Sequence, residues 1–183
     1  MFYWPVDDEI RLRVWETADA EPLAALVHAQ AEYLAQWLPF ATEAYDVDDA
    51  LSYIERTRRE WAAYEACELA LLVGPDWAIA GSVGIHAIDR MNGRGEIGYW
   101  LSQSHQGRGL MTRAVRALVT HAFSALGLNR VEIRAQPGNS KSRAIPERLG
   151  FTEEALLRED LRHPDGYVDH VVYGLLKKEW IGL

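Results

Sequence analysis

The sequence predicts a mixed α/β protein of the α+β kind, in which a central mixed sheet of about seven strands, mostly antiparallel, is flanked by four helices. Short runs that alternate apolar and polar residues, typical of half-buried strands, lie among longer runs with apolar residues three and four positions apart, typical of helices. The strand-like runs are joined by short glycine-, proline- or asparagine-containing turns in some places and by helices in others. Antiparallel and parallel neighbours are therefore both expected in one sheet.

The first half of the chain predicts one strand, two helices and then three strands. The strand at 10–16 places Leu12 and Val14 on one side and Arg11 and Arg13 on the other. The elements after it are a helix capped by Thr17 or Asp19 and running to Leu34, a helix at 47–67, and strands at 69–73, 79–88 and 95–102.

The second half of the chain predicts two helices and three strands. A helix begins behind the glycine-containing turn at 106–111 and ends at Gly127, since glycine is the usual residue just after a helix. The remaining elements are a strand at 130–136, a short helix at 139–149 closed by Gly150, and strands at 151–161 and 168–176 joined by the His163–Gly166 turn.

Composition favours a single domain, 1–183, of a globular protein with 49% hydrophobic and 25% charged residues. The net charge of −8 argues against nucleic acid as a direct partner and favours a cationic substrate such as an amine. The N-terminal segment lacks the basic start and apolar core of a signal peptide, and no stretch reaches the length of a membrane span. We therefore expect a cytoplasmic protein with no membrane partner.

The cysteine and the histidines limit which disulfide, thiol and metal chemistry we expect. The single cysteine, Cys67, excludes an intrachain disulfide and is expected to be a small apolar filler on a helix rather than a catalytic thiol. The histidines show no metal-ligand spacing with each other or with Cys67, so we expect no metal. Seven tryptophans could furnish a subunit interface, which leaves a homodimer open.

The segment Gln106–Met111, between a strand and a long amphipathic helix, predicts a cradle for phosphate. Gly107 and Gly109 let the backbone pass close to a bound group with its N–H bonds pointing outward, and the helix behind them adds the positive end of its dipole. The dinucleotide fingerprint is excluded because Thr112 stands where its third glycine would be. The Gly-Lys-Ser/Thr of a P-loop is also missing from this turn. A nucleotide-bearing cofactor held by a different kind of turn is expected.

The order of elements and this turn resemble the GNAT N-acetyltransferase superfamily, whose phosphate turn reads Gln/Arg-x-x-Gly-x-Gly/Ala; Met111 stands here in place of the final small residue. Further segments resemble its ribosomal-protein-serine N-acetyltransferase branch, the RimJ/RimL type, and the likeness runs from about Leu12 to Trp180. These segments are Trp37–Pro39, Gly98–Leu101, Leu128–Val131, Asn139–Ala144 and Glu147–Phe151.

The resemblance implies acetyl-CoA as the acetyl donor, with no metal. The diphosphate would lie on the glycine turn, and the pantetheine arm would lie like an added strand against the end of the strand before it. Asn139 would complete the clamp, although it is equally suited to cap the short helix that follows. The residues implied in cofactor binding are Trp100, Leu101, Ser102, Gln106, Gly107, Arg108, Gly109, Leu110, Met111, Asn139 and Arg143.

Acetyl transfer needs a neutral amine, which sets what a catalytic base must do. Deprotonation near neutral pH costs roughly 4 kcal/mol for a lysine but about 1 kcal/mol for an α-amine, so a modest base suffices for an α-amine. Glu96, on the strand leading to the turn, is the first candidate for this base. Glu159 and Asp160 are alternatives, because the resemblance implies a carboxylate near their positions. The resemblance places Ser142 near the departing sulfur. Tyr173 is an alternative acid, although its strand position favours a core role.

These features predict an acetyl-CoA-dependent N-acetyltransferase in which a primary amine attacks directly in a ternary complex. A protein N-terminal α-amine, such as that of a ribosomal protein, is the favoured acceptor because of the RimJ/RimL likeness. Two alternatives stay open. One is an acetyltransferase for a small amine, and the other is a non-catalytic acyl-CoA-binding sensor or regulatory module that keeps the cradle but lacks a working base.

Overall fold

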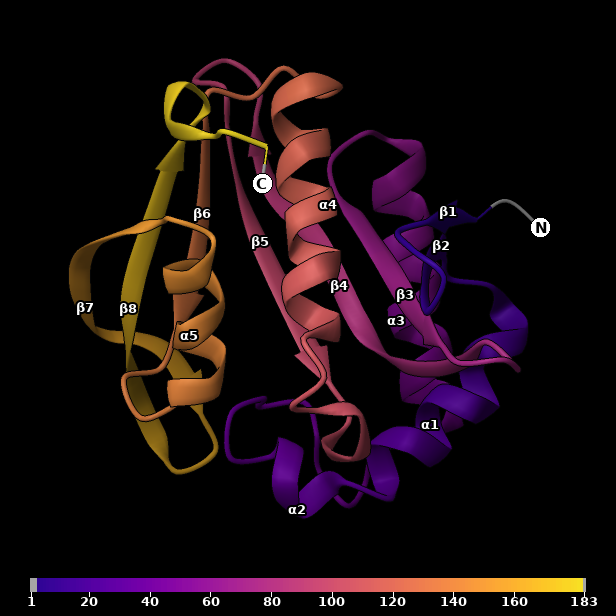
Figure 1. Ribbon diagram of the computed structural model, residues 1–183. Coiled ribbons are helices and arrows are strands. Elements are labelled where there is room, and N and C mark those ends of the chain that lie inside the picture. Colours follow the sequence, from indigo (N-terminus) through magenta and orange to yellow (C-terminus); the bar gives the residue numbers. More distant parts are fainter. Residues whose placement is uncertain (1–2, 183) are drawn as a thin grey trace. The chain divides into compact units, whose positions relative to one another are not determined.

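The computed structural model describes residues 3–182, and within that range the chain has eight strands and five α-helices (Figure 1). The strands are β1 (Trp4–Pro5), β2 (Ile10–Val14), β3 (Cys67–Val73), β4 (Ala78–Asp89), β5 (Arg94–Leu101), β6 (Arg130–Ala135), β7 (Thr152–His163) and β8 (Gly166–Leu176). The helices are α1 (Ala20–His28), α2 (Ala31–Leu34), α3 (Val47–Ala62), α4 (Leu110–Ser124) and α5 (Ser140–Arg148).

The strands form one hydrogen-bonded sheet in the order β1-β2-β3-β4-β5-β6-β8-β7. Strand β5 pairs with β6 in parallel, whereas β1 with β2, β2 with β3, β6 with β8 and β7 with β8 pair antiparallel. The predicted mixed, mostly antiparallel sheet with flanking helices is therefore confirmed. The numbers of elements differ from the prediction, with eight strands instead of seven and five helices instead of four among the described residues.

Two local features account for these differences. Trp4 and Pro5 pair with Leu12 and Arg11 as a two-residue strand, too short to show a periodic pattern. The first predicted helix is broken at Ala29–Gln30, where Gln30 has φ −131° and ψ 17° and so leaves the helical conformation. The amide oxygen of Gln30 accepts from the main-chain N–H of Gln103 at 2.6 Å, a contact that no local pattern reveals.

The chain forms two compact units within the described residues. Unit 1 comprises the residues up to Gly84 together with Tyr99–Ala114, and unit 2 comprises Ile85–Gly98 together with the residues from Val115 onward. Strands β4 and β5 and helix α4 each contribute residues to both units.

In unit 1, helices α1 and α3 pack against each other, and α3 also packs against β3. Trp15, fully buried, meets the ring of Tyr53 edge-on at 5.8 Å between centroids, a favoured arrangement for aromatic pairs. The other buried members of this core are apolar side chains of α1, α2, α3, β3 and their connections: Ala20, Leu23, Ala24, Val27, Leu34, Ala41, Ala50, Ile54, Ala70 and Leu72.

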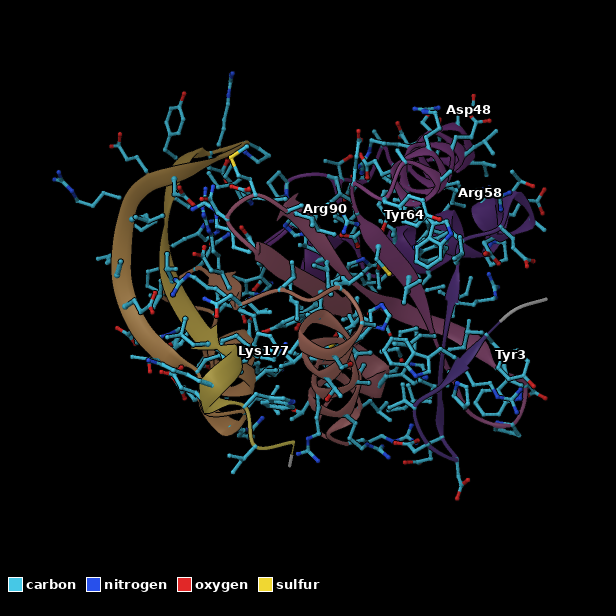
Figure 2. The ribbon with its side chains drawn as sticks, turned by 90° about the horizontal axis from the view of Figure 1, so that it is seen from above. Tyr3, Asp48, Arg58, Tyr64, Arg90 and Lys177 are labelled. Atoms are coloured by element: carbon cyan, nitrogen blue, oxygen red, sulfur yellow. The ribbon has the colours of Figure 1, made fainter. Side chains whose placement is uncertain are left out.

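The end of α3 differs from the prediction and relocates the cysteine. The helix ends at Ala62 rather than near 67, because Tyr64 adopts a left-handed conformation with φ +59°. Tyr64 is exposed at this end of the helix (Figure 2). Cys67 consequently begins β3 instead of lying on a helix, and it is buried there. Burial raises the pKa of the Cys67 thiol to about 12, which leaves it protonated and unreactive near neutral pH.

In unit 2, strand β6 lies between β5 and β8 and has two contrasting faces. The buried side of β6 carries Val131, Ile133 and Ala135. Tyr173 of β8 lies on the same side of the sheet, and its hydroxyl contacts Glu147 of α5. Charged side chains occupy the opposite side. We call this side the ionic face, and its residues are His86, Glu96, Arg130, Glu132, Arg134, Glu154, Asp160 and His170.

Candidate functional site

The glycine turn before α4 has the geometry that phosphate binding requires. Gly107 and Gly109 have φ +76° and +70°, the left-handed region that favours glycine. A Cβ built on either residue would meet no protein atom within 4 Å, so the space over both glycines is open. The Gly109 carbonyl accepts from the N–H of Arg113 at 3.1 Å and so begins the helix.

The main-chain N–H groups from Gly107 to Met111 donate to no acceptor among residues 3–182. Exposed N–H groups gathered at the start of a 15-residue helix attract anions through both hydrogen bonds and the helix dipole. The Leu110 and Met111 side chains point the other way and are buried. Met111, which departs from the family pattern, is therefore accommodated as a core residue, and its N–H remains on the open side.

The strand end that precedes this turn is held by hydrogen bonds and close backbone packing within unit 1. Ser102 donates its N–H to the Ala80 carbonyl at 2.8 Å, and its hydroxyl lies 2.6 Å from His105 Nδ1. A Cβ on Gly81 would stand 2.2 Å from the Trp100 carbonyl oxygen, so a glycine is needed where β4 passes the end of β5. Trp100 and Leu101 complete this strand end as predicted.

Gln106 connects the turn to the α1–α2 region. Its side-chain amide donates to the Tyr33 hydroxyl and, at 3.4 Å, to the Leu101 carbonyl. Together with the Gln30–Gln103 bond, this ties residues 30–33 to the approach of the turn. Sequence reasoning missed Gln30, Tyr33 and Gln103, because their partners are 73 residues away along the chain.

A hollow of about 560 Å³ opens beside these contacts. Its lining is mostly polar and includes two carboxylates: His28, Ala29, Gln30, Ala31, Glu32, Tyr33, Glu43 and Gln103. The hollow therefore offers hydrogen-bonding groups and negative charge within unit 1, a combination suited to an amine.

Arg108, which the resemblance implies in cofactor binding, is paired with a carboxylate of the protein. Its guanidinium lies 3.0 Å from Glu9, and Arg113 lies 2.7 Å from both Glu9 and Asp7. Hydrogen bonds from Arg113 and then Arg108 hold the pKa of Glu9 below its usual value. Arg108 would thus exchange an exposed carboxylate for a phosphate rather than gain a first partner.

In unit 2, Asn139 caps α5, as the sequence predicts. Its side-chain oxygen accepts from the N–H of Ser142 at 3.1 Å. Ser142 lies in the first turn of this helix. The Arg143 guanidinium donates to the Tyr173 hydroxyl at 2.8 Å, to the Pro137 carbonyl and to Glu153.

The Tyr173 hydroxyl is built into the packing between β8 and α5. It accepts from Arg143, and its single proton is shared between the carboxylates of Glu147 at 3.2 Å and Glu153 at 3.3 Å, while the residue is 1% exposed. Burial is the main cause that raises the pKa of Tyr173. These contacts agree with the core role that its strand position favours.

Glu96 lies on the ionic face, half buried between Arg134 and the imidazole of His86. One oxygen is 3.1 Å from Arg134 Nε and the other is 3.5 Å from His86 Nε2. The alternative carboxylate Asp160 is also engaged, since it accepts from His170 at 2.8 Å and lies 3.4 Å from Arg134. The other alternative, Glu159, is exposed at a bulge of β7 with φ +53°.

Residues 3–182 offer neither a metal site nor a membrane-spanning helix. They contain no group of three or more histidine, cysteine, aspartate or glutamate residues placed to hold a metal ion. None of their helices is long and apolar enough to cross a membrane.

Known proteins are similar to this chain in sequence and in fold. Residues 9–152 match the acetyltransferase (GNAT) domain family. The putative ribosomal N-acetyltransferase YdaF of Bacillus subtilis (strain 168) is 41% identical over 183 residues, 100% of this chain and 99% of the relative. The ribosomal-protein-serine acetyltransferase of Escherichia coli (strain K12) is 34% identical over 95 residues, 52% of this chain and 53% of the relative.

A solved structure extends the likeness to a cofactor complex. The microcin C7 self immunity acetyltransferase MccE, crystallised with acetyl-CoA and AMP, superposes with a TM-score of 0.87 at 28% identity, over 93% of this chain and 94% of that one. The family match covers well over half of the chain, and the relatives are N-acetyltransferases. This chain therefore belongs to the GNAT acetyltransferase family and is an N-acetyltransferase of the RimJ/RimL-like type.

Proposed function

We propose that the whole chain acts as one cytoplasmic GNAT domain that transfers an acetyl group from acetyl-CoA to a primary amine, with the N-terminal α-amine of a ribosomal-type protein as the favoured acceptor. The observation that carries this proposal is the open turn at Gly107–Met111, whose N–H groups have no acceptor in residues 3–182. An acetyl-CoA complex of the similar MccE supports the choice of cofactor.

On the donor side, main-chain groups would hold the diphosphate and side chains would add to them. Gln106 to Met111 would supply the cradle, with Arg108 leaving Glu9 for a phosphate oxygen. Trp100, Leu101 and Ser102 would line the pantetheine arm. Asn139 and Arg143 are proposed as further cofactor-binding residues, each while retaining a part of its structural role in α5.

On the acceptor side, an amine must lose two protons in all when it enters as an ammonium. The first leaves before attack, so that the nitrogen lone pair can form the C–N bond to the acetyl carbon. The C–S bond then breaks with its electron pair on sulfur, and the second nitrogen proton goes to the thiolate. We propose that Glu96 takes part in accepting the first proton. Ser142 would lie beside the departing sulfur.

The acidic hollow supports an amine acceptor. Glu32 and Glu43 lie in its lining beside the hydroxyl of Tyr33 and the amides of Gln30 and Gln103. An α-ammonium or a basic N-terminal segment would find charge compensation there, in agreement with the net charge of −8.

The test is release of free thiol from acetyl-CoA with a panel of acceptors. A peptide beginning with serine is expected to turn over, and the same peptide blocked by N-terminal acetylation is the matched control, which should not. A polyamine and an aminoglycoside test the small-amine alternative. Acetyl-CoA binding by calorimetry without turnover of any acceptor would favour the sensor and reject the enzyme mechanism.

A further inference from the structure

The pair formed by His86 and Glu96 points to a residue that the sequence analysis did not select. His86, on β4, places Nε2 3.5 Å from a Glu96 carboxylate oxygen on β5. This distance is that of a loose ion pair, and catalytic pairs commonly tighten only when substrate is bound. The His86 side chain is 39% exposed and that of Glu96 is 22% exposed, so the imidazole is the more accessible of the two.

The neighbouring strand is shaped around this ring. A Cβ on Gly98 would stand 2.8 Å from His86 Cε1, closer than real side-chain contacts allow. The imidazole therefore lies directly over the Gly98 backbone, on the same side of β5 as Glu96. Gly98, which is part of the Gly98–Leu101 segment, has a physical role here, because any side chain would displace the ring.

The charges around the pair favour histidine over glutamate as the proton acceptor. The negative charge of Glu96 is already compensated by Arg134 at 3.1 Å, and Arg134 is shared with Glu132 and Asp160. An ordinary glutamate has a pKa of about 4.3 and an ordinary histidine about 6.5, so imidazole is the better match to an α-amine near neutral pH. The charged groups on this side of the sheet include Glu68 of β3, whose carboxylate lies over Gly84 on the same side of β4 as His86, Glu96 of β5, Glu132 and Arg134 of β6, Asp160 of β7 and His170 of β8.

We propose that His86 takes the proton of the acceptor ammonium and that Glu96 is a positioning residue, which holds the ring and compensates the charge it gains. This inference rests on the proposed function. The ammonium gives one proton to the imidazole, which passes it to solvent. The neutral nitrogen forms the C–N bond as the C–S bond breaks. The second nitrogen proton goes to the thiolate, so that the products are amide, free thiol and one released proton.

The test is the pH dependence of kcat/KM from pH 5.5 to 9.5, with acetyl-CoA and the serine-initiated peptide, in the full-length protein. His86→Gln is expected to lower kcat/KM by about 100-fold near pH 7 and to leave only the ionisation of the amine itself near pH 8. Glu96→Gln should keep the histidine ionisation but move it to lower pH, because the imidazolium loses its carboxylate. His163→Gln, at the last residue of β7, is the matched control with unchanged kcat/KM.

Two glycine variants of β5 distinguish displacement of the His86 ring from a general loss of packing in the strand. Gly98→Ala should displace the His86 ring and lower kcat/KM with little change in acetyl-CoA affinity. Gly95→Ala is the control on the opposite side of β5, where the new methyl meets Ile85 and Leu128 side chains at 3.1 Å. Equal effects of the two variants on kcat/KM would contradict the inference.

Other outcomes distinguish this inference from the proposed function. If Glu96→Gln abolishes the acidic limb while His86→Gln keeps it, then Glu96 itself is the base and the inference is wrong, although the enzyme assignment stands. If wild type and His163→Gln both fail to turn over any amine, the proposed function fails and takes the inference with it. An NMR titration of the His86 ring needs no turnover: Glu96→Gln should lower its pKa, and equal values in the two proteins would overturn the pairing.

Discussion

Replacing Gly109 by alanine tests the phosphate cradle, and Gly127 provides a matched control. Gly109 stands just before α4 with φ +70°, and Gly127 follows the same helix with φ +69°. A Cβ on either residue meets no protein atom within 4 Å, so both substitutions add a methyl group to open space. The two variants therefore impose the same backbone strain at opposite ends of one helix.

The expected loss of stability is the same for both. A left-handed conformation costs an L-residue about 1–2 kcal/mol, and the lower entropy of the unfolded alanine chain offsets about 0.4–1 kcal/mol of this. A net loss of about 1 kcal/mol lowers Tm by about 2–4 °C in a protein of this size. Thermal denaturation of both variants checks this value.

The expected loss of acetyl-CoA affinity differs sharply between the two. At Gly109 the methyl group enters the space over the N–H donors, and strain relief would turn those donors away. Losing one hydrogen bond to a charged oxygen costs about 1.5–3 kcal/mol, which corresponds to about 10-fold or greater weakening of the Kd measured by calorimetry. Gly127→Ala should bind as wild type does, and Gly109→Trp should not bind. Wild-type affinity in Gly109→Ala would refute the cradle.

Three further predictions concern stability and reactivity. Asp19→Asn should lower the free energy of unfolding by about 3 kcal/mol in a urea titration, because it leaves Arg13 buried without its partner at 2.5 and 2.7 Å; a loss below about 1 kcal/mol would contradict this role. Cys67 should resist iodoacetamide in the native protein at pH 8, since burial raises its pKa to about 12, and Cys67→Ala should keep full transfer activity. The hydrogen bond from His170 holds the pKa of Asp160 below its usual value, so its stabilisation is present above about pH 4 and is lost as the pH falls through the lowered pKa. The Tm of Asp160→Asn should therefore fall less than the Tm of wild type on acidification below pH 4. Parallel curves of Tm against pH for the two proteins would contradict this stabilisation by Asp160.

Elements defined by local chemistry were predictable from the sequence. The turn at Gly107 and Gly109, the stop at Gly127 and the cap at Asn139 all depend on residues within one helical turn of the position they set. The strands from β2 to β8 follow from apolar periodicity and the turns between them. For this reason the fold class and the phosphate turn could both be predicted.

Elements set by distant contacts were not predictable in the same way. The break between α1 and α2 depends on Gln30 reaching Gln103, and the early end of α3 depends on a left-handed tyrosine, a residue that carries no turn signal. Cys67 was misplaced as a direct consequence. Periodicity reports which side of an element is apolar, but it does not report a hydrogen bond formed 73 residues away.

In the candidate site, the charged side chains and the main-chain N–H groups differ in whether they already have partners. Arg108, Arg143 and Glu96 are the charged members of the predicted site, and the structure gives each of them a partner of opposite charge within its own unit. A ligand that recruits such a side chain must first replace that partner, so its net gain from the contact is reduced. The N–H groups at Gly107–Met111 have no acceptor to give up among the described residues. A phosphate displaces only solvent from these groups, and this is why a backbone feature, readable from two glycines, is expected to carry more of the cofactor affinity than the arginines beside it.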